Sequence, residues 1–139
     1  MIKIKFEDSP KVVDYSDDLP ISDEVLIDSG EIVLRFTFPL RREVDLKFKC
    51  KAGFSRLTLF KCVNLGYSRI YDKEEEEVGD PGRMTGLRNR KESNGPYGIW
   101  GYYLDDLVLD RIVFKEVECL GKSLKKSVKR VIGFVELVV

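Results

Sequence analysis

The stretch from Phe54 to Asp72, FSRLTLFKCVNLGYSRIYD, decides the fold, because here the spacing of apolar residues changes from two to about 3.6. On a helical wheel its apolar residues fall within about 120°. They are Leu59, Phe60, Val63, Tyr67, Ile70 and Tyr71. Ser55 stands where a helix N-cap is needed, and Gly66 lies at the margin of the apolar stripe, which favours close approach of a neighbouring strand. The pattern predicts one main helix over about residues 55–73, packed on a sheet.

Segments on both sides of this helix alternate apolar with polar residues, as half-buried strands do. They cover residues 2–6, 32–38, 44–50 and 107–114, with a brief strand at 25–27. The short PLRRE segment suits an antiparallel hairpin between the second and third of them. The inward parity slips between Leu109 and Ile112, which indicates a bulge near Asp110.

The final segment, VIGFVELVV, is apolar at nearly every position, which places it near the centre of the sheet. The basic segment before it turns at Gly121 and allows a short helix containing Leu124 and Val128. Together these patterns predict an α+β fold in a single domain over residues 1–139, with a mostly antiparallel sheet. They also predict a long structured loop over about residues 74–104, a length that is often functional.

The amino-acid composition excludes several kinds of catalytic site and limits the possible binding partners. The 139 residues include no histidine, which removes Ser-His-Asp and Cys-His catalysis and the commonest metal ligand. Lysine plus arginine equals aspartate plus glutamate, so the total charge does not favour nucleic acid. Three cysteines without CxxC spacing indicate a reduced compartment. With no signal peptide and no apolar run of about 18 residues, we expect a soluble, cytoplasmic protein that meets no membrane.

The segment from Ser93 to Asp110, SNGPYGIWGYYLDDLVLD, is the first candidate site. Gly95, Gly98 and Gly101 recur every third residue, and each permits a positive φ or a close backbone approach. Large rings with polar tips stand between and after them. They are Tyr97, Trp100, Tyr102 and Tyr103. The segment is either a recognition surface or a tight elbow whose rings fill the gap between helix and sheet, and both hold if Trp100 is buried while Tyr102 or Tyr103 is displayed.

Carboxylates form the second candidate. The glutamates Glu74 to Glu77 fall at or past the expected helix end, and Asp105 and Asp106 follow the aromatic segment. If the loop folds back, Glu74, Glu75 and Asp106 could bind Ca²⁺ or Mg²⁺ or divide acid and base roles. The glutamates lack EF-hand spacing, so the simpler interpretation is a solvated charge run, and we expect neither a metal nor a cofactor.

A basic cluster in the same loop is the third candidate. It comprises Arg83, Arg88, Arg90 and Lys91, with Asn89 and Asn94 nearby. These groups could grip phosphate or RNA while Tyr97 or Trp100 stacks on a base. Alternatively, they pair with the preceding glutamates and hold the loop closed. The glycines match no phosphate-loop or dinucleotide motif.

Residues 44–113 carry a distinctive string. A helix ends in Tyr67-x-x-Ile70-Tyr71 and is followed by Glu74 and Glu75; Asn89-Arg90 comes next, and then Tyr97-Gly98-Ile99-Trp100-Gly101 and Asp106-Leu107-Val108-Leu109. The string resembles an uncharacterised family of large DNA viruses, plants and protists with a Tyr-Gly-Ile-Trp-Gly-His-Asp box. Here Tyr102-Tyr103 stands where His-Asp is expected. The resemblance implies a large-virus origin and lowers the expectation of catalysis.

These features favour a non-catalytic binding or structural module, such as a viral accessory or virion protein in the host cytoplasm, with a protein as partner. Its predicted binding residues lie in the aromatic loop. They are Arg88, Asn89, Arg90, Tyr97, Trp100, Tyr102, Tyr103 and Asp106. One alternative is a carboxylate- and metal-dependent enzyme acting on a phosphorylated or sugar substrate; the other is a single-stranded nucleic-acid binder.

Overall fold

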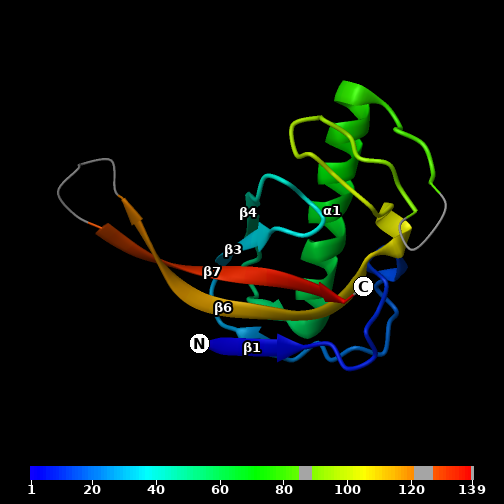
Figure 1. Ribbon diagram of the computed structural model, residues 1–139. Coiled ribbons are helices and arrows are strands. Elements are labelled where there is room, and N and C mark those ends of the chain that lie inside the picture. Colours follow the sequence, from blue (N-terminus) through cyan, green and yellow to red (C-terminus); the bar gives the residue numbers. More distant parts are fainter. Residues whose placement is uncertain (85–88, 121–126, 139) are drawn as a thin grey trace.

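The fold is α+β, with one main helix across one face of an open, mostly antiparallel sheet (Figure 1). The computed structural model describes residues 1–84, 89–120 and 127–138. Five strands form the main sheet, in the order β1-β6-β7-β3-β4. They are β1 (Ile2–Lys5), β3 (Glu31–Phe36), β4 (Val44–Lys49), β6 (Val108–Leu120) and β7 (Ser127–Val138). The remaining elements are β2 (Val25–Ile27), β5 (Phe54–Ser55), α1 (Arg56–Val78) and the 3₁₀ turns η1 (Val12–Asp14) and η2 (Leu104–Asp106).

The strand pairings confirm the expected sheet. β3 and β4 form the antiparallel hairpin, with Leu34 opposite Leu46. The mostly apolar β7 lies in the middle of the sheet. It pairs antiparallel with β6 and parallel with β3. The register shifts between Leu109 and Arg111, so the bulge lies where the slip in apolar parity placed it.

The N-terminal two thirds of α1 pack on the sheet through apolar side chains. Ser55 caps the helix by accepting a hydrogen bond from the Thr58 amide at 3.0 Å. A Cβ at Gly66 would lie 2.2 Å from Cζ of Phe36 on β3, so glycine is what allows the Phe36 ring to approach the helix. Phe36 in turn packs edge-on against Tyr67, with ring centroids 4.9 Å apart.

Two elements extend further than the sequence indicated. α1 continues to Val78, past the expected end near residue 73, and the Gly79 amide closes it on the Glu75 carbonyl. Glutamate is a good helix former, and a lysine–glutamate pair four residues apart, Lys73 with Glu77 at 3.4 Å, supports the last turns. Residues 127–130 belong to β7, so the short helix through Val128 was wrong, because cross-strand pairing with β6 continues there; Leu124 lies outside the described residues.

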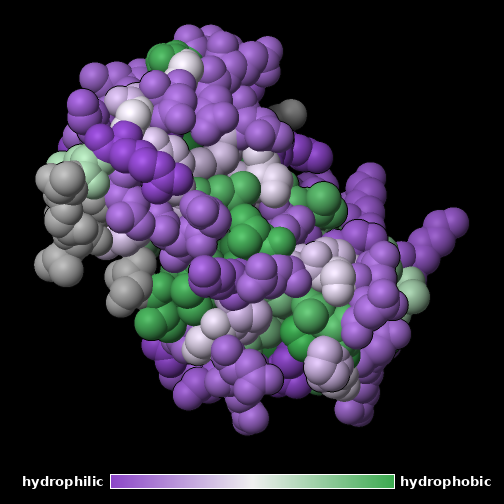
Figure 2. Space-filling view, turned by 90° about the vertical axis from the view of Figure 1, so that its right-hand side faces the viewer, coloured by the Kyte–Doolittle hydropathy of each residue, from purple (hydrophilic) through white to green (hydrophobic). Residues whose placement is uncertain are grey.

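The two ends of α1 lie against different parts of the chain. The lower part stands behind β6 and β7, while its C-terminal turns rise beyond the sheet beside the loop that follows (Figure 1). Figure 2 views the molecule from the right-hand side of Figure 1. The surface of its upper part is mainly hydrophilic, and hydrophobic residues gather across the middle. The loop that follows α1 therefore lies beside the C-terminal turns of the helix (Figure 1).

Candidate functional site

The aromatic loop, defined here as residues 89–106, folds against the C-terminal turns of α1 and has its own internal pairing. The backbones of Arg90 and Gly101 form an isolated antiparallel β-bridge, and the Ser93 amide donates to the Ile99 carbonyl at 2.9 Å. The preceding β3–β4 connection also holds the loop, since the Trp100 amide donates to the Pro39 carbonyl at 3.1 Å. The loop is thus fixed on two sides by backbone hydrogen bonds.

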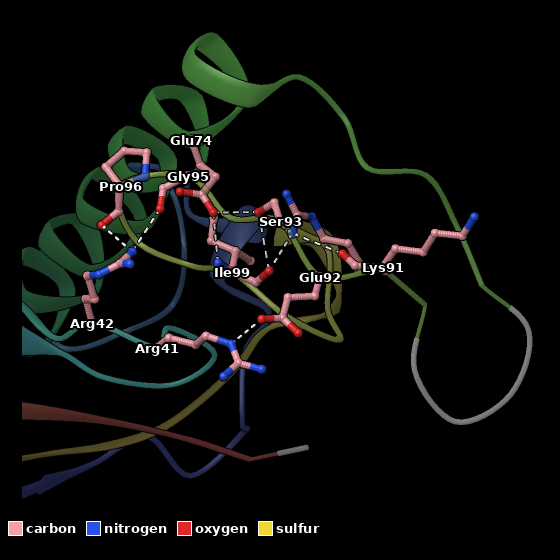
Figure 3. Close-up of polar contacts among 10 residues, drawn as sticks. Arg41, Arg42, Glu74, Lys91, Glu92, Ser93, Gly95, Pro96 and Ile99 are labelled. Atoms are coloured by element: carbon pink, nitrogen blue, oxygen red, sulfur yellow. Dashed lines mark hydrogen bonds and ion pairs between the residues drawn. The ribbon is translucent and has the colours of Figure 1, made fainter.

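Glu74 anchors this loop to α1 (Figure 3). Its side chain is 0% exposed, although it belongs to a run of four glutamates. The Ser93 hydroxyl donates to Oε2 at 2.5 Å, the Ile99 amide donates to Oε2 at 2.9 Å, and the Tyr97 amide donates to Oε1 at 2.9 Å. One carboxylate therefore satisfies three donors of a loop that would otherwise lie unpaired against the helix.

The hydrogen bonds decide the charge state of Glu74. Burial by itself would raise its pKa, but the donors from Ser93 and from the backbone of Ile99 and Tyr97 favour the carboxylate and bring the pKa below its ordinary value. Gly95 makes this approach possible, because a Cβ at that position would lie 2.3 Å from Oε1 of Glu74. Gly98 and Gly101 have φ of +64° and +75°, so all three glycines meet the expectation of positive φ or close approach.

Arg90 is also buried, and 0% of its surface is exposed. Its Nη1 donates to the Ile99 carbonyl at 3.0 Å and to the Ser93 hydroxyl at 3.2 Å, so Ser93 links it to Glu74. Among the described residues, its Nε and Nη2 have no hydrogen-bond acceptor, and Cζ lies 5.7 and 5.8 Å from the ring centroids of Tyr71 and Tyr103. Cation–π contact offsets part of the cost of burying this charge. Arg90 therefore supports the loop from inside.

Asn89, Tyr103 and Asp106 form a second group of internal contacts. Asp106 accepts the Tyr103 amide on Oδ2 at 2.9 Å and the Asn89 side-chain amide on Oδ1 at 2.8 Å. The Tyr103 hydroxyl donates to Asp80 at 3.0 Å, and Arg83 stacks on its ring at 4.6 Å. A backbone bond from Gly82 and the Tyr103 bond lower the pKa of Asp80. These contacts close the segment between α1 and the loop.

The displayed part of the loop is aromatic. Trp100 and Tyr102 are partly exposed and pack around Phe38, with centroids 5.2 and 5.3 Å from the Phe38 ring. Tyr97 is partly buried against the core. The sequence suggested a buried Trp100 beside an exposed Tyr102 or Tyr103. In the structure, Trp100 and Tyr102 are both partly exposed. Arg88 lies outside the described residues.

A surface hollow of about 270 Å³ lies next to Trp100. It is lined by Arg41, Met84, Arg90, Lys91, Glu92, Trp100 and Gly101. Arg41 and Glu92 form an ion pair across it (Figure 3). Met84 is 44% exposed, so an apolar and an aromatic side chain stand beside charged side chains in one depression.

The proposed carboxylate set is not assembled. Glu74 is occupied by loop donors, Glu75 is exposed on α1, and Asp106 is bound to Tyr103 and Asn89. Across residues 1–84, 89–120 and 127–138, no three histidine, cysteine, aspartate or glutamate side chains gather as metal ligands. The arrangement uses these carboxylates to hold backbone and amide donors.

The buried roles of Glu74 and Arg90 were missed in the sequence, although one signal for Glu74 was present. Position 74 lies seven residues after Tyr67, four after Ile70 and three after Tyr71, so it continues the buried stripe of α1. No comparable periodicity exists for Arg90, which lies in irregular backbone.

Comparison of the chain with protein-family models, with curated proteins and with solved structures found no match. Within the described part of the chain, no helix has both the length and the apolar composition needed to cross a membrane.

Proposed function

We propose that this protein is a non-catalytic binding module that recognises a protein partner through the aromatic loop. The observation that carries the proposal is the combination of a rigid internal anchor at Glu74 with a partly exposed aromatic cluster of Phe38, Trp100 and Tyr102. Protein interfaces concentrate their binding energy in tryptophan, tyrosine and arginine held in place before binding.

The hollow beside Trp100 supports the same surface. A partner side chain entering it would contact Met84 and Trp100 and would meet Lys91 and the Arg41–Glu92 pair at the edge. Interfaces commonly have this composition, with an apolar or aromatic centre and a charged rim. The arrangement favours a partner that inserts an apolar side chain flanked by acidic residues.

The experiment is affinity capture followed by titration of the captured partner. A Trp100→Ala, Tyr102→Ala double variant is compared with wild type and with Leu65→Ala, which truncates a 47% exposed leucine on α1 away from the loop. Loss of a binding centre of this kind weakens affinity by roughly 30-fold or more, corresponding to about 2 kcal/mol.

The same partner should be retained by wild type and by the Leu65 control at equal affinity. Far-ultraviolet circular dichroism and melting temperature establish that the double variant is folded. Equal affinity of the folded double variant for that partner would remove the aromatic loop as the binding surface.

A further inference from the structure

The five-stranded sheet packs against α1 with one face, and strand register identifies the residues on its other face. Side chains directly opposite each other in neighbouring strands share a face. Lys3 is opposite Val113, Lys115 is opposite Ile132, and Arg35 is opposite Phe134. None of these is in the cluster of core residues that packs with α1, whereas their chain neighbours Ile4, Phe114 and Leu34 are. We call the face bearing Lys3, Lys115 and Phe134 the outer face.

Three of the four carboxylates on the outer face are matched by cations of neighbouring strands. Arg35 contacts Asp45 at 2.7 Å, Lys47 contacts Glu31 at 3.3 Å, and Arg111 contacts Glu136 at 2.6 Å. The fourth, Asp110 at the bulge of β6, contacts Arg111 at 3.7 Å. Glu116 of β6 lies by register on the opposite face, with Phe114.

Five more cations lie on the same strands, and none has an ion-pair partner among the described residues. They are Lys3, Lys5, Lys49, Lys115 and Arg130. Eight cations and four carboxylates give the outer face a net charge of +4, while the chain as a whole has 24 of each and no net charge. Glu43 borders this face and lies 3.9 Å from Arg35, so acidic groups gather at the end of the sheet near Arg35 and Arg111.

An aromatic ring stands in the middle of this charge. Phe134 is partly exposed on the central strand β7, and its ring centroid lies 4.3 Å from Nζ of Lys115 and 5.1 Å from Cζ of Arg35. Beside it, a hollow of about 370 Å³ is lined by Val33, Lys47 and Arg130, together with Glu31, Ile32 and Val131. Lys115 and Arg35 both lie over the Phe134 ring, so a base packs against the ring by replacing one of them, and the displaced cation is then placed to contact a phosphate.

We propose that the outer face binds single-stranded nucleic acid, with Lys3, Lys49, Lys115 and Arg130 on phosphates and Phe134 against a base. An aromatic side chain can pack against a base only where that base is unstacked, as in a single strand. This surface is distinct from the aromatic loop, so its test is independent of the protein-binding proposal. Arg90 of the aromatic loop does not carry it, because its side chain is buried.

The test is fluorescence anisotropy with labelled twelve-nucleotide oligo-dT and oligo-U and with a twelve-base-pair duplex. Four phosphate contacts predict a slope of about −2.8 in log K against log salt, which is roughly a 50-fold loss of affinity between 50 and 200 mM salt. Both single strands should bind more tightly than the duplex.

Two variants locate the site. Lys115→Glu with Arg130→Glu should weaken oligonucleotide binding at least tenfold, and Phe134→Leu should weaken it about fivefold with the salt slope retained. The control, Lys61→Glu with Arg69→Glu, makes the same charge change at exposed positions on α1 and should weaken binding less than threefold.

Melting temperatures of all variants are measured first, so that only folded proteins are compared. The proposal is overturned by absence of oligonucleotide binding at 50 mM salt, by equal or tighter binding of the duplex, or by equal weakening in the control. Binding of anionic phospholipid vesicles without binding of either oligonucleotide would likewise overturn it.

Discussion

The two halves of α1 are held by opposite kinds of contact. The first half buries Leu59, Val63 and Tyr67 against the sheet, with Gly66 admitting the Phe36 ring. The last turns bury a carboxylate, Glu74, which binds the amides and hydroxyl of a loop. Apolar contact gives strong but non-directional attachment, whereas the carboxylate fixes the position of each donor. The comparison teaches that the aromatic loop depends for its position on a few polar atoms.

The largest expected effect is at Glu74. Glu74→Gln removes the charge and places an NH₂ group among donors, so the free energy of unfolding should fall by about 2–4 kcal/mol. Glu76→Gln, two positions along the same helix and exposed, should change it by less than about 0.5 kcal/mol. Urea unfolding of both variants measures the difference, and equal values for the two would refute the anchoring role.

The apolar contact between α1 and the sheet is tested by a substitution at Gly66. Gly66→Ala should destabilise by about 1–3 kcal/mol, because the added Cβ would lie 2.2 Å from the Phe36 ring. Helix propensity alone predicts the opposite sign, a gain of about 1 kcal/mol. Adding Phe36→Leu to this variant should recover part of the loss, measured by urea unfolding. A Gly66→Ala protein more stable than wild type would show that the close contact is not limiting.

Low pH should weaken the contacts that Glu74 makes with the aromatic loop. Because hydrogen bonds lower the pKa of Glu74 in the folded state, its stabilising contribution is complete above the unfolded pKa, near 4.3, and is lost as pH falls through the folded value. The difference in unfolding free energy between wild type and Glu74→Gln should therefore be constant from pH 7 to about 5 and shrink below about 4.5. A difference that grows on acidification has the wrong sign for this account.

The smallest expected effect concerns a thiol on α1. Cys62 is 5% exposed, and burial raises its pKa to about 12, whereas Cys50 is partly exposed. In a Cys119→Ser background, one thiol should react with Ellman's reagent in the native protein, and Cys62 should react roughly 100-fold more slowly. Mass spectrometry identifies the modified residue, and rapid modification of both thiols would show that the helix–sheet contact opens readily.

The same contrast explains what the sequence could predict. Period-two strands, the period change at Phe54, the cap at Ser55 and the bulge at Asp110 follow from local pattern, and the structure confirms them. The glutamate run hid Glu74, because a charged residue is ordinarily assigned to solvent and only its partners across the fold reverse that assignment. Arg90 was expected at the surface for the same reason. Its burial depends on Ser93 and Ile99, whose positions depend on Glu74.

The outer face illustrates a limit of composition. Equal totals of acidic and basic residues predicted no preference for nucleic acid, yet register gathers eight cations and four carboxylates on one side of the sheet. Charge totals are independent of strand order, while surface charge depends on it.

The most direct measurement is amide hydrogen exchange at Tyr97 and Ile99 in wild type and in Glu74→Gln. Both amides donate to Glu74, so they should be protected in wild type and should exchange at least 30-fold faster in the variant, while amides of β3 remain protected. Rapid exchange of Tyr97 and Ile99 in wild type, or unchanged protection in the variant, would contradict the conclusion that this buried carboxylate holds the aromatic loop on α1.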